Sequence, residues 1–200
     1  MAQYDLRDIK VAKYVNNNST VTYTGATKAG DAMAVDLEMR TAEGRLFAES
    51  VQAEYMRKIV GGTISMGVKY LSDAVQTLLF GAAAKSRSIT YEVGTTEVTE
   101  SVTGVAYGAN TTPNYVGVAC YSPCKRDSVE KYLCLFIPKT LFGPPSMSLR
   151  TCGQDITFQT PTTSGEFLAS DASDKELIEM VTVDSEAAAI AWVDAVFNAA

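Results

Sequence analysis

The chain has 200 residues, 46% of them hydrophobic and 20% charged, which is the composition of a globular protein that buries about 70% of its unfolded surface. Its formal net charge is −6, which argues against a protein that grips nucleic acid, because phosphate contacts need clustered Lys and Arg side chains. The N-terminal stretch MAQYDLRDIK lacks the apolar segment of a secretory signal, and no apolar run approaches the ~18 residues of a membrane span, so we expect a cytoplasmic product without a membrane partner.

The first part of the chain predicts strands. Residues 9–15 (IKVAKYV) read as a short strand, and residues 32–41 (AMAVDLEMRT) alternate between hydrophobic and charged side chains with the period of two of a half-buried strand. The pair Glu43-Gly44 reads as a turn from which residues 45–56 run back. The sequence therefore predicts a long hairpin over residues 32–56.

Residues 63–81 carry the clearest pattern of the chain, which passes from strand to helix. They follow Gly61-Gly62, which reads as a turn, and their first half alternates apolar residues with small polar ones. Ser72 or Asp73 can then cap a helix that Gly81 ends. The apolar residues of this helix share one side, which is enough to cover one end of a sheet: Val75, Leu78 and Leu79.

The second half continues with short strands and ends in a helix. We expect Pro138 and the later Gly143-Pro144-Pro145 to force a loop. Asp184 or Ser185 caps the C-terminal helix, expected over residues 185–198, which carries an apolar stripe. The further strands are expected at residues 88–93, 115–121, 129–138, 155–160, 164–169 and 177–183, with a Thr-rich segment at 95–105.

These elements predict a mainly β protein with minor α content. Many short strands and two short helices favour a β sandwich or barrel, flanked by the short helix and the C-terminal helix. No repeat, linker or shift in composition divides the chain, so we expect a single domain over residues 1–200.

Candidate catalytic and metal-binding residues are few. The chain contains no histidine, which removes the commonest general base and metal ligand. Its four cysteines are Cys120, Cys124, Cys134 and Cys152. A zinc site built from them would lack a C-x-x-C pair, so the spacing favours reduced thiols that act as small apolar residues.

Carboxylates offer the other candidate chemistry. Asp36 and Glu38 lie on one strand face about 7 Å apart, as an acid–base pair requires, but a solvated strand face carries such pairs routinely. Thiol-dependent catalysis around Cys124, or carboxylate-dependent catalysis around Asp36, would need a base beside it that the sequence does not supply. We therefore expect no enzymatic activity and no cofactor.

Three blocks of sequence together resemble a known family. They are GGTISMGVKYLSDAVQTLLFG, KYLCLFIPKTLFGPPSMSLRTCGQDITFQTPTTSGEF and VTVDSEAAAIAWVDAVF. In this order and spacing they are similar to the major tail tube proteins of long-tailed, non-contractile bacteriophages. The matching positions are residues 71–76, 158–161 and 181–197, whereas residues 95–114 match no part of that family and read as a variable loop.

The resemblance implies a structural virion protein. It implies a β sandwich flanked by a helix, and six subunits that join their sheets into a ring with a continuous inner barrel. Such rings stack into a hollow tube that surrounds a tape measure protein and later conducts genomic DNA, a non-specific cargo, towards the host. The further partners implied are the tail terminator and the distal tail or baseplate proteins. The implied location is the phage tail, after assembly in the host cytoplasm.

The resemblance also suggests where the assembly contacts lie. If the long hairpin faces the channel, its carboxylates line the lumen; the alternative is that they face bulk solvent or neighbouring subunits. The hairpin tip would touch the next ring. The lumen candidates are Asp36, Glu38, Glu49 and Glu54, and the contact candidates are Arg40, Glu43, Gly44, Arg45 and Leu46. A non-enzymatic β-sandwich binding or adhesion module of a phage tail is the alternative function.

Overall fold

A computed structural model describes residues 2–18, 20–48, 51–126, 128–148, 151 and 160–198. Antiparallel strands dominate these residues, which confirms the mainly β prediction. The helices are α1 (Asp73–Phe80) and α2 (Glu186–Ala195), and neither is long and apolar enough to cross a membrane. The strands are β1 (Ala2–Gln3), β2 (Arg7–Asn17), β3 (Thr20–Lys28), β4 (Ala32–Ala48), β5 (Val51–Val68), β6 (Ala83–Val93), β7 (Thr96–Ala106), β8 (Tyr115–Arg126), β9 (Val129–Phe142), β10 (Thr162–Phe167) and β11 (Glu179–Val183).

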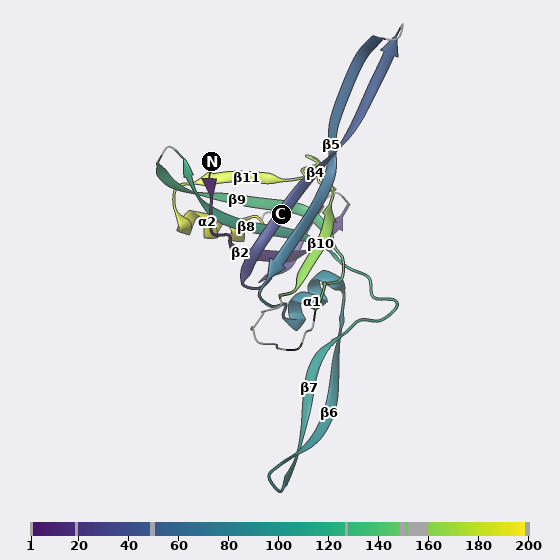
Figure 1. The fold of residues 1–200 in the computed structure, drawn as a ribbon, viewed down its shortest axis with the longest axis vertical. Helices are drawn as coiled ribbons and strands as arrows, with labels where there is room; N and C mark the ends of the chain where they lie inside the picture. Colours follow the sequence, from purple (N-terminus) through teal and green to yellow (C-terminus); the bar gives the residue numbers. More distant parts are fainter. Residues whose placement is uncertain are drawn as a thin grey trace.

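A nine-stranded sheet forms the body. Its order is β3-β2-β8-β9-β10-β5-β4, with β1 beside β8 and β11 beside β9. β8, β9 and β11 run across the body, while β10, β5 and β4 run along its long axis (Figure 1). The sheet therefore bends, and its two parts enclose a common core.

The core lies between these two parts of the sheet. The alternation predicted for β5 is confirmed, since Ile64, Met66 and Val68 are buried while Thr63 is exposed. Tyr70, which continues the pattern in the sequence, lies beyond the strand and is exposed. Other fully buried members come from β2, β8, β9, β10 and α1: Ile9, Val11, Val116, Ile137, Phe142, Phe167, Val75, Leu79 and Phe80.

Helix α1 begins and ends where the sequence predicts. The Ser72 hydroxyl accepts a hydrogen bond from the Val75 amide, which satisfies one of the free N–H groups of the first turn. Gly81 adopts a left-handed φ of 68° and its amide donates to the Thr77 carbonyl. Between these two ends, Val75, Leu79 and Phe80 pack into the core, so α1 covers one end of it.

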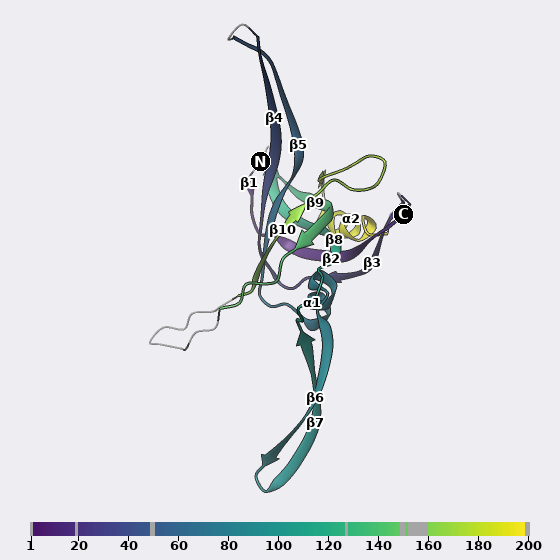
Figure 2. The same ribbon diagram turned by 90° about the vertical axis from the view of Figure 1, so that its right-hand side faces the viewer.

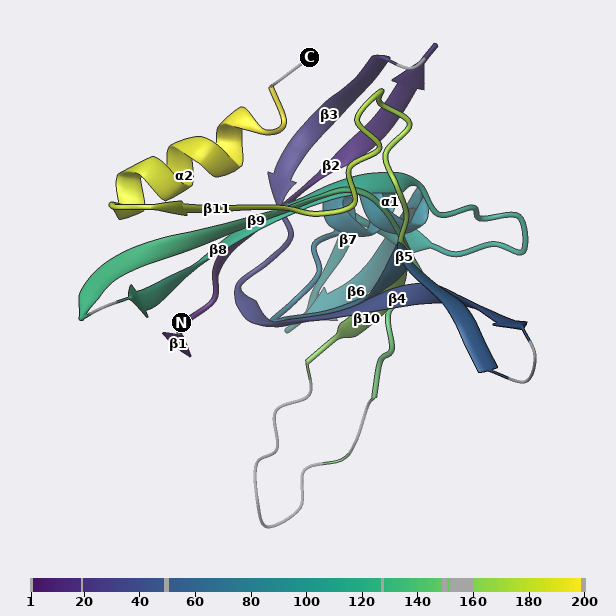
Figure 3. The same ribbon diagram turned by 90° about the horizontal axis from the view of Figure 1, so that it is seen from above.

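Helix α2 packs on the opposite side of the β2-β8-β9 layer (Figure 3). Ser185 caps it, as predicted, and Ala189 and Val193 are fully buried. The rings of Phe136 and Phe197 meet edge to face at 5.7 Å between centroids. Strand β3, which the sequence analysis missed, completes this cluster with Tyr23, 5.5 Å from the Phe136 ring.

The β4–β5 and β6–β7 hairpins project from the body in opposite directions along its long axis (Figures 1 and 2). The β4–β5 hairpin runs past the predicted turn, since Gly44 pairs with Met56 and Ala48 with Val51. Gly61-Gly62 also lies inside a strand. The predicted turns at Glu43-Gly44 and Gly61-Gly62 are therefore wrong. The β6–β7 hairpin turns at Gly94, whose φ is 68°.

Pro138, which was expected to force a loop, does not end a strand. It lies within β9, where the register between β9 and β8 shifts. A bulge tolerates proline because the ladder hydrogen bond is already interrupted there. The strand expected over residues 155–160 falls almost entirely on residues 152–159, outside the described part of the chain, as does Cys152.

Candidate assembly surfaces

One face of the β10-β5-β4 part of the sheet points away from the core and carries carboxylates. Cross-strand pairing places Glu166 beside Thr63 and Thr63 beside Glu38. The next row on this face joins Ser164, Ser65 and Asp36. We call this surface, with Arg40, the acidic face; between its charges it carries only short side chains.

The predicted lumen residues divide between two places. Asp36 and Glu38 lie together on the acidic face and are exposed. Glu54 is also exposed but lies far along the β4–β5 hairpin, where it pairs with Leu46. Glu49 lies outside the described residues. The structure thus brings two of the four candidates together.

The predicted contact residues lie along the hairpin and not at its tip, because the turn comes later. Arg40 forms an ion pair of 3.0 Å with Glu166. Glu43 pairs with Arg57 at 3.1 Å, and the Arg45 guanidinium lies 5.6 Å from the centre of the Tyr55 ring. One face of the outer hairpin is therefore held together by contacts within the chain.

The other face of the outer β4–β5 hairpin has no such network among the described residues. Alternation and pairing place Leu46, Met56 and Lys58 on it, together with Glu54 and the small Ala42 and Gly44. We call these six residues the Leu46 face. Leu46 is 58% exposed and Met56 is 74% exposed. Solvent-exposed apolar side chains on a projecting hairpin are typical of a binding surface.

The β6–β7 hairpin is amphipathic although every residue of β6 is exposed. One face carries hydroxyl groups, including the bonded pair Thr90 and Thr99, whose oxygens are 2.9 Å apart. The opposite face, which we call the Tyr91 face, consists of Lys85, Arg87, Ile89, Tyr91, Val93, Thr96, Val98, Glu100, Val102 and Gly104. The sequence predicted a strand over residues 88–93 but not this surface, although the alternation in SITYEV could have revealed it.

The remaining candidates offer little chemistry. Cys120, Cys124 and Cys134 are buried free thiols, and burial raises the pKa of Cys120 to about 12 and that of Cys134 to about 11. Within the described residues, no three His, Cys, Asp or Glu side chains are placed to hold a metal ion. Buried thiols of raised pKa are poor nucleophiles.

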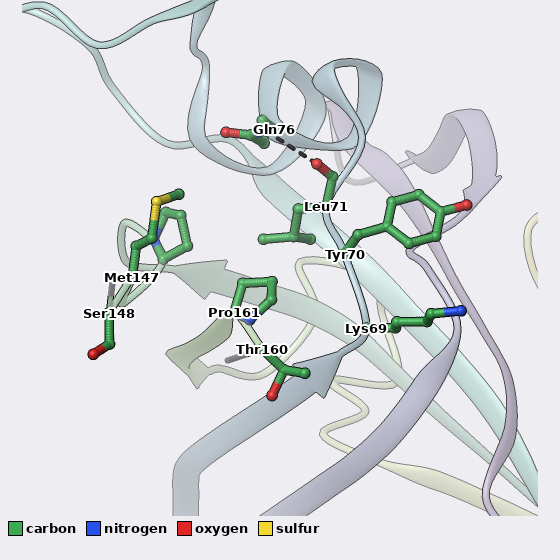
Figure 4. Close-up of a pocket in the computed structure, with 9 residues that line it drawn as sticks. Lys69, Tyr70, Leu71, Gln76, Met147, Ser148, Thr160 and Pro161 are labelled. Carbon is green, nitrogen blue, oxygen red and sulfur yellow. Dashed lines mark hydrogen bonds between the residues drawn. The ribbon is translucent and has the colours of Figure 1, made fainter. Parts of the chain in front are cut away.

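A groove of about 280 Å³ lies beside α1 (Figure 4). Leu71, Pro161 and Met147 line it, with Lys69 and Tyr70 at one side. Gln76 on α1 also lines it, and its side chain donates a hydrogen bond of 3.1 Å to the Leu71 carbonyl. The described residues that line it include no carboxylate or thiol.

Comparison of the chain with protein-family models and with curated proteins finds no match. Function is therefore inferred from the residues and their arrangement.

Proposed function

We propose that the chain is the structural subunit of a phage tail tube, in which hexameric rings stack into a hollow conduit for genomic DNA. The observation that carries this proposal is the pair of hairpins that project in opposite directions (Figure 2). An isolated two-stranded hairpin is marginally stable in water. Hairpins of this length with exposed apolar side chains are expected to be stabilised by neighbouring molecules.

The opposed directions favour a filament. A contact between the upper end of one copy and the lower end of the next is head to tail, and such a contact repeats without closing. Strands β3 and β4 end the main path of the sheet, and each pairs on one side only among the described residues. A ring that joins these edges between neighbours would remove exposed backbone donors and acceptors that otherwise promote aggregation.

The acidic face suits the inner wall of a DNA conduit. Asp36, Glu38 and Glu166 would repel phosphate, and the short hydroxyl side chains between them offer little for a base to stack on. DNA in contact with this face would remain mobile. In the virion the tube would enclose the tape measure protein and end against terminator and baseplate proteins.

Electron microscopy of the purified chain tests the proposal. A concentration series is examined by negative stain, and light scattering gives the mass of each species. Hollow filaments or six-membered rings at raised concentration are expected. Discrete particles that bind a surface ligand would favour the adhesion module, and a chain that stays monomeric at every concentration would overturn the tube.

A further inference from the structure

The Tyr91 face of the β6–β7 hairpin carries exposed apolar and charged side chains that no other described element covers. Tyr91 is 42% exposed and Val93 is 61% exposed, and neither contacts the sheet of the body. The hairpin pairs only with itself, as a separate two-stranded sheet. A surface of this composition on a projecting hairpin indicates a protein partner.

The Leu46 face at the other end of the molecule has matching chemistry. It offers Leu46 and Met56 as apolar contacts, with Lys58 nearer the body and Glu54 nearer the tip. Neither charged side chain has an ion-pair partner among the described residues. The two hairpins point in opposite directions, so a copy shifted along the long axis brings its β6–β7 hairpin beside this face (Figure 1).

The charges on the two faces are complementary in both order and spacing. On the Tyr91 face, Lys85 lies near the body, Arg87 lies two residue positions further out beside Val102, and Glu100 lies four positions out, opposite Ile89. On the Leu46 face, Lys58 and Glu54 are also four positions apart. Each interval spans about 13 Å along a strand.

Direction decides which charges meet. We follow the long axis from the tip of the β6–β7 hairpin towards the tip of the β4–β5 hairpin. In this direction Glu100 comes before Lys85, because Glu100 lies nearer the tip of the β6–β7 hairpin. In the same direction Lys58 comes before Glu54, because Glu54 lies nearer the tip of the β4–β5 hairpin. Overlap of the two hairpins therefore sets each carboxylate against a cation.

We infer that the Tyr91 face of one copy docks on the Leu46 face of the next copy along the axis. Glu100 faces Lys58, Lys85 faces Glu54, and Val102 packs near Met56. The inference deepens the proposed function, on which it rests, by naming the surfaces that join successive rings. It also gives a role to β7, which lies within the segment 95–114 that no part of the resemblance covers.

The size of the contact fits a polymer that assembles reversibly. The Leu46 face spans five residues of each strand and covers about 160 Å², estimated from strand rise and spacing, against about 800 Å² per partner in a stable complex. One hairpin contact is therefore weak. Six contacts around a ring act together, so stacking becomes firm only when a whole ring docks.

Charge reversal tests the pairing directly. The variants are Lys58→Glu, Glu100→Lys and the double variant, in which every copy carries both changes. Glu97→Lys is the matched control, because Glu97 lies three residues from Glu100 but on the hydroxyl face. The critical concentration for filament formation is measured by sedimentation and by electron microscopy.

Each single reversal is expected to raise the critical concentration at least about fivefold, because it sets like charges face to face. The double variant should return to within about twofold of the unmodified chain, and Glu97→Lys should leave assembly unchanged. Ile89→Thr with Val102→Thr, which keeps strand propensity, should raise the critical concentration more than about tenfold.

The outcomes separate the two proposals. Filaments that form equally well with every variant would overturn the hairpin contact and leave the tube standing. Loss in both single variants without recovery in the double variant would also overturn the pairing of Lys58 with Glu100. An unmodified chain that never assembles would overturn both proposals.

Discussion

Arg40 on β4 and Glu166 on β10 form an ion pair of 3.0 Å that reaches across the intervening strand β5. The pair links the edge strand β4 to β10, the strand that joins the two parts of the sheet. It also lowers the net negative charge of the acidic face. Arg40 was a candidate for contact with the next ring, and its guanidinium is already bound within its own chain.

Replacing Arg40 by Gln is expected to lower the free energy of unfolding by less than about 1 kcal/mol, because both side chains of the pair are exposed to solvent. Urea denaturation of Arg40→Gln, Glu166→Gln and the double variant measures the coupling. The free energy of unfolding of the double variant should fall by no more than the larger of the two single losses plus a few tenths of a kcal/mol. A loss above about 2 kcal/mol in either single variant would contradict an exposed, weakly coupled pair.

Truncating the helix that covers the core should be far more damaging. Leu79 on α1 is fully buried, so Leu79→Ala is expected to lower the free energy of unfolding by between about 2 and 5 kcal/mol through lost burial and the cavity left behind. Thr77→Ala on the exposed side of the same helix is the control and should change stability by less than about 0.5 kcal/mol. Equal effects of the two variants would show that α1 does not support the core.

Local signals in the sequence predicted the elements that are fixed by local chemistry. Ser72, Gly81 and Ser185 cap their helices as expected, because a cap depends on a few neighbouring residues. The strand patterns of the core were also visible, since burial on one face writes a period of two into the sequence. The placement of Asp36 and Glu38 on one strand face followed from the same alternation, whereas Glu166 joins them only through the pairing of β10 with β5.

The length and turn position of the two hairpins could not be predicted in this way. Both faces of the outer β4–β5 hairpin are exposed, so no burial pattern fixes its register or its length. Glu43-Gly44 offered turn chemistry that the pairing of Gly44 with Met56 overrides. For the β6–β7 hairpin, the sequence predicted a strand over residues 88–93 but neither the full length of β6 nor its pairing with β7. How the two hairpins point depends on the tertiary fold, and no segment of sequence encodes it alone.

Acid should weaken the contact that holds the loop after β10 against the sheet. The Lys139 ammonium lies 2.7 Å from the Asp171 carboxylate, which also accepts a hydrogen bond from the Tyr14 hydroxyl. Both contacts favour the charged form, so the pKa of Asp171 is below its ordinary value. The stabilisation is complete above about pH 4, the unfolded pKa, and is lost as the pH falls through the lower folded pKa.

The measurement compares the unmodified chain with Asp171→Asn by urea denaturation between about pH 7 and pH 3. The difference in unfolding free energy should be constant above about pH 5 and should shrink as the solution becomes more acidic. Lys139→Gln should remove the same pH dependence, because Lys139 is the main cause of the shift. A difference that stays constant down to the lowest pH would exclude a lowered pKa for Asp171.

The three buried thiols should be unreactive until the protein unfolds. Cys120, Cys124 and Cys134 are at most 3% exposed, and burial raises the pKa of Cys120 to about 12. Because the thiolate is the reactive form, labelling at pH 8 should be more than about 100-fold slower than for a free cysteine. Peptide mapping by mass spectrometry reads each thiol separately, and the same chain in guanidinium chloride provides full labelling as the control. Rapid labelling of Cys120 or Cys134 in the folded chain would mean that the β8-β9 layer opens readily. That result would reopen the hypothesis that these cysteines take part in catalysis. Slow labelling would indicate that they serve only to pack the core.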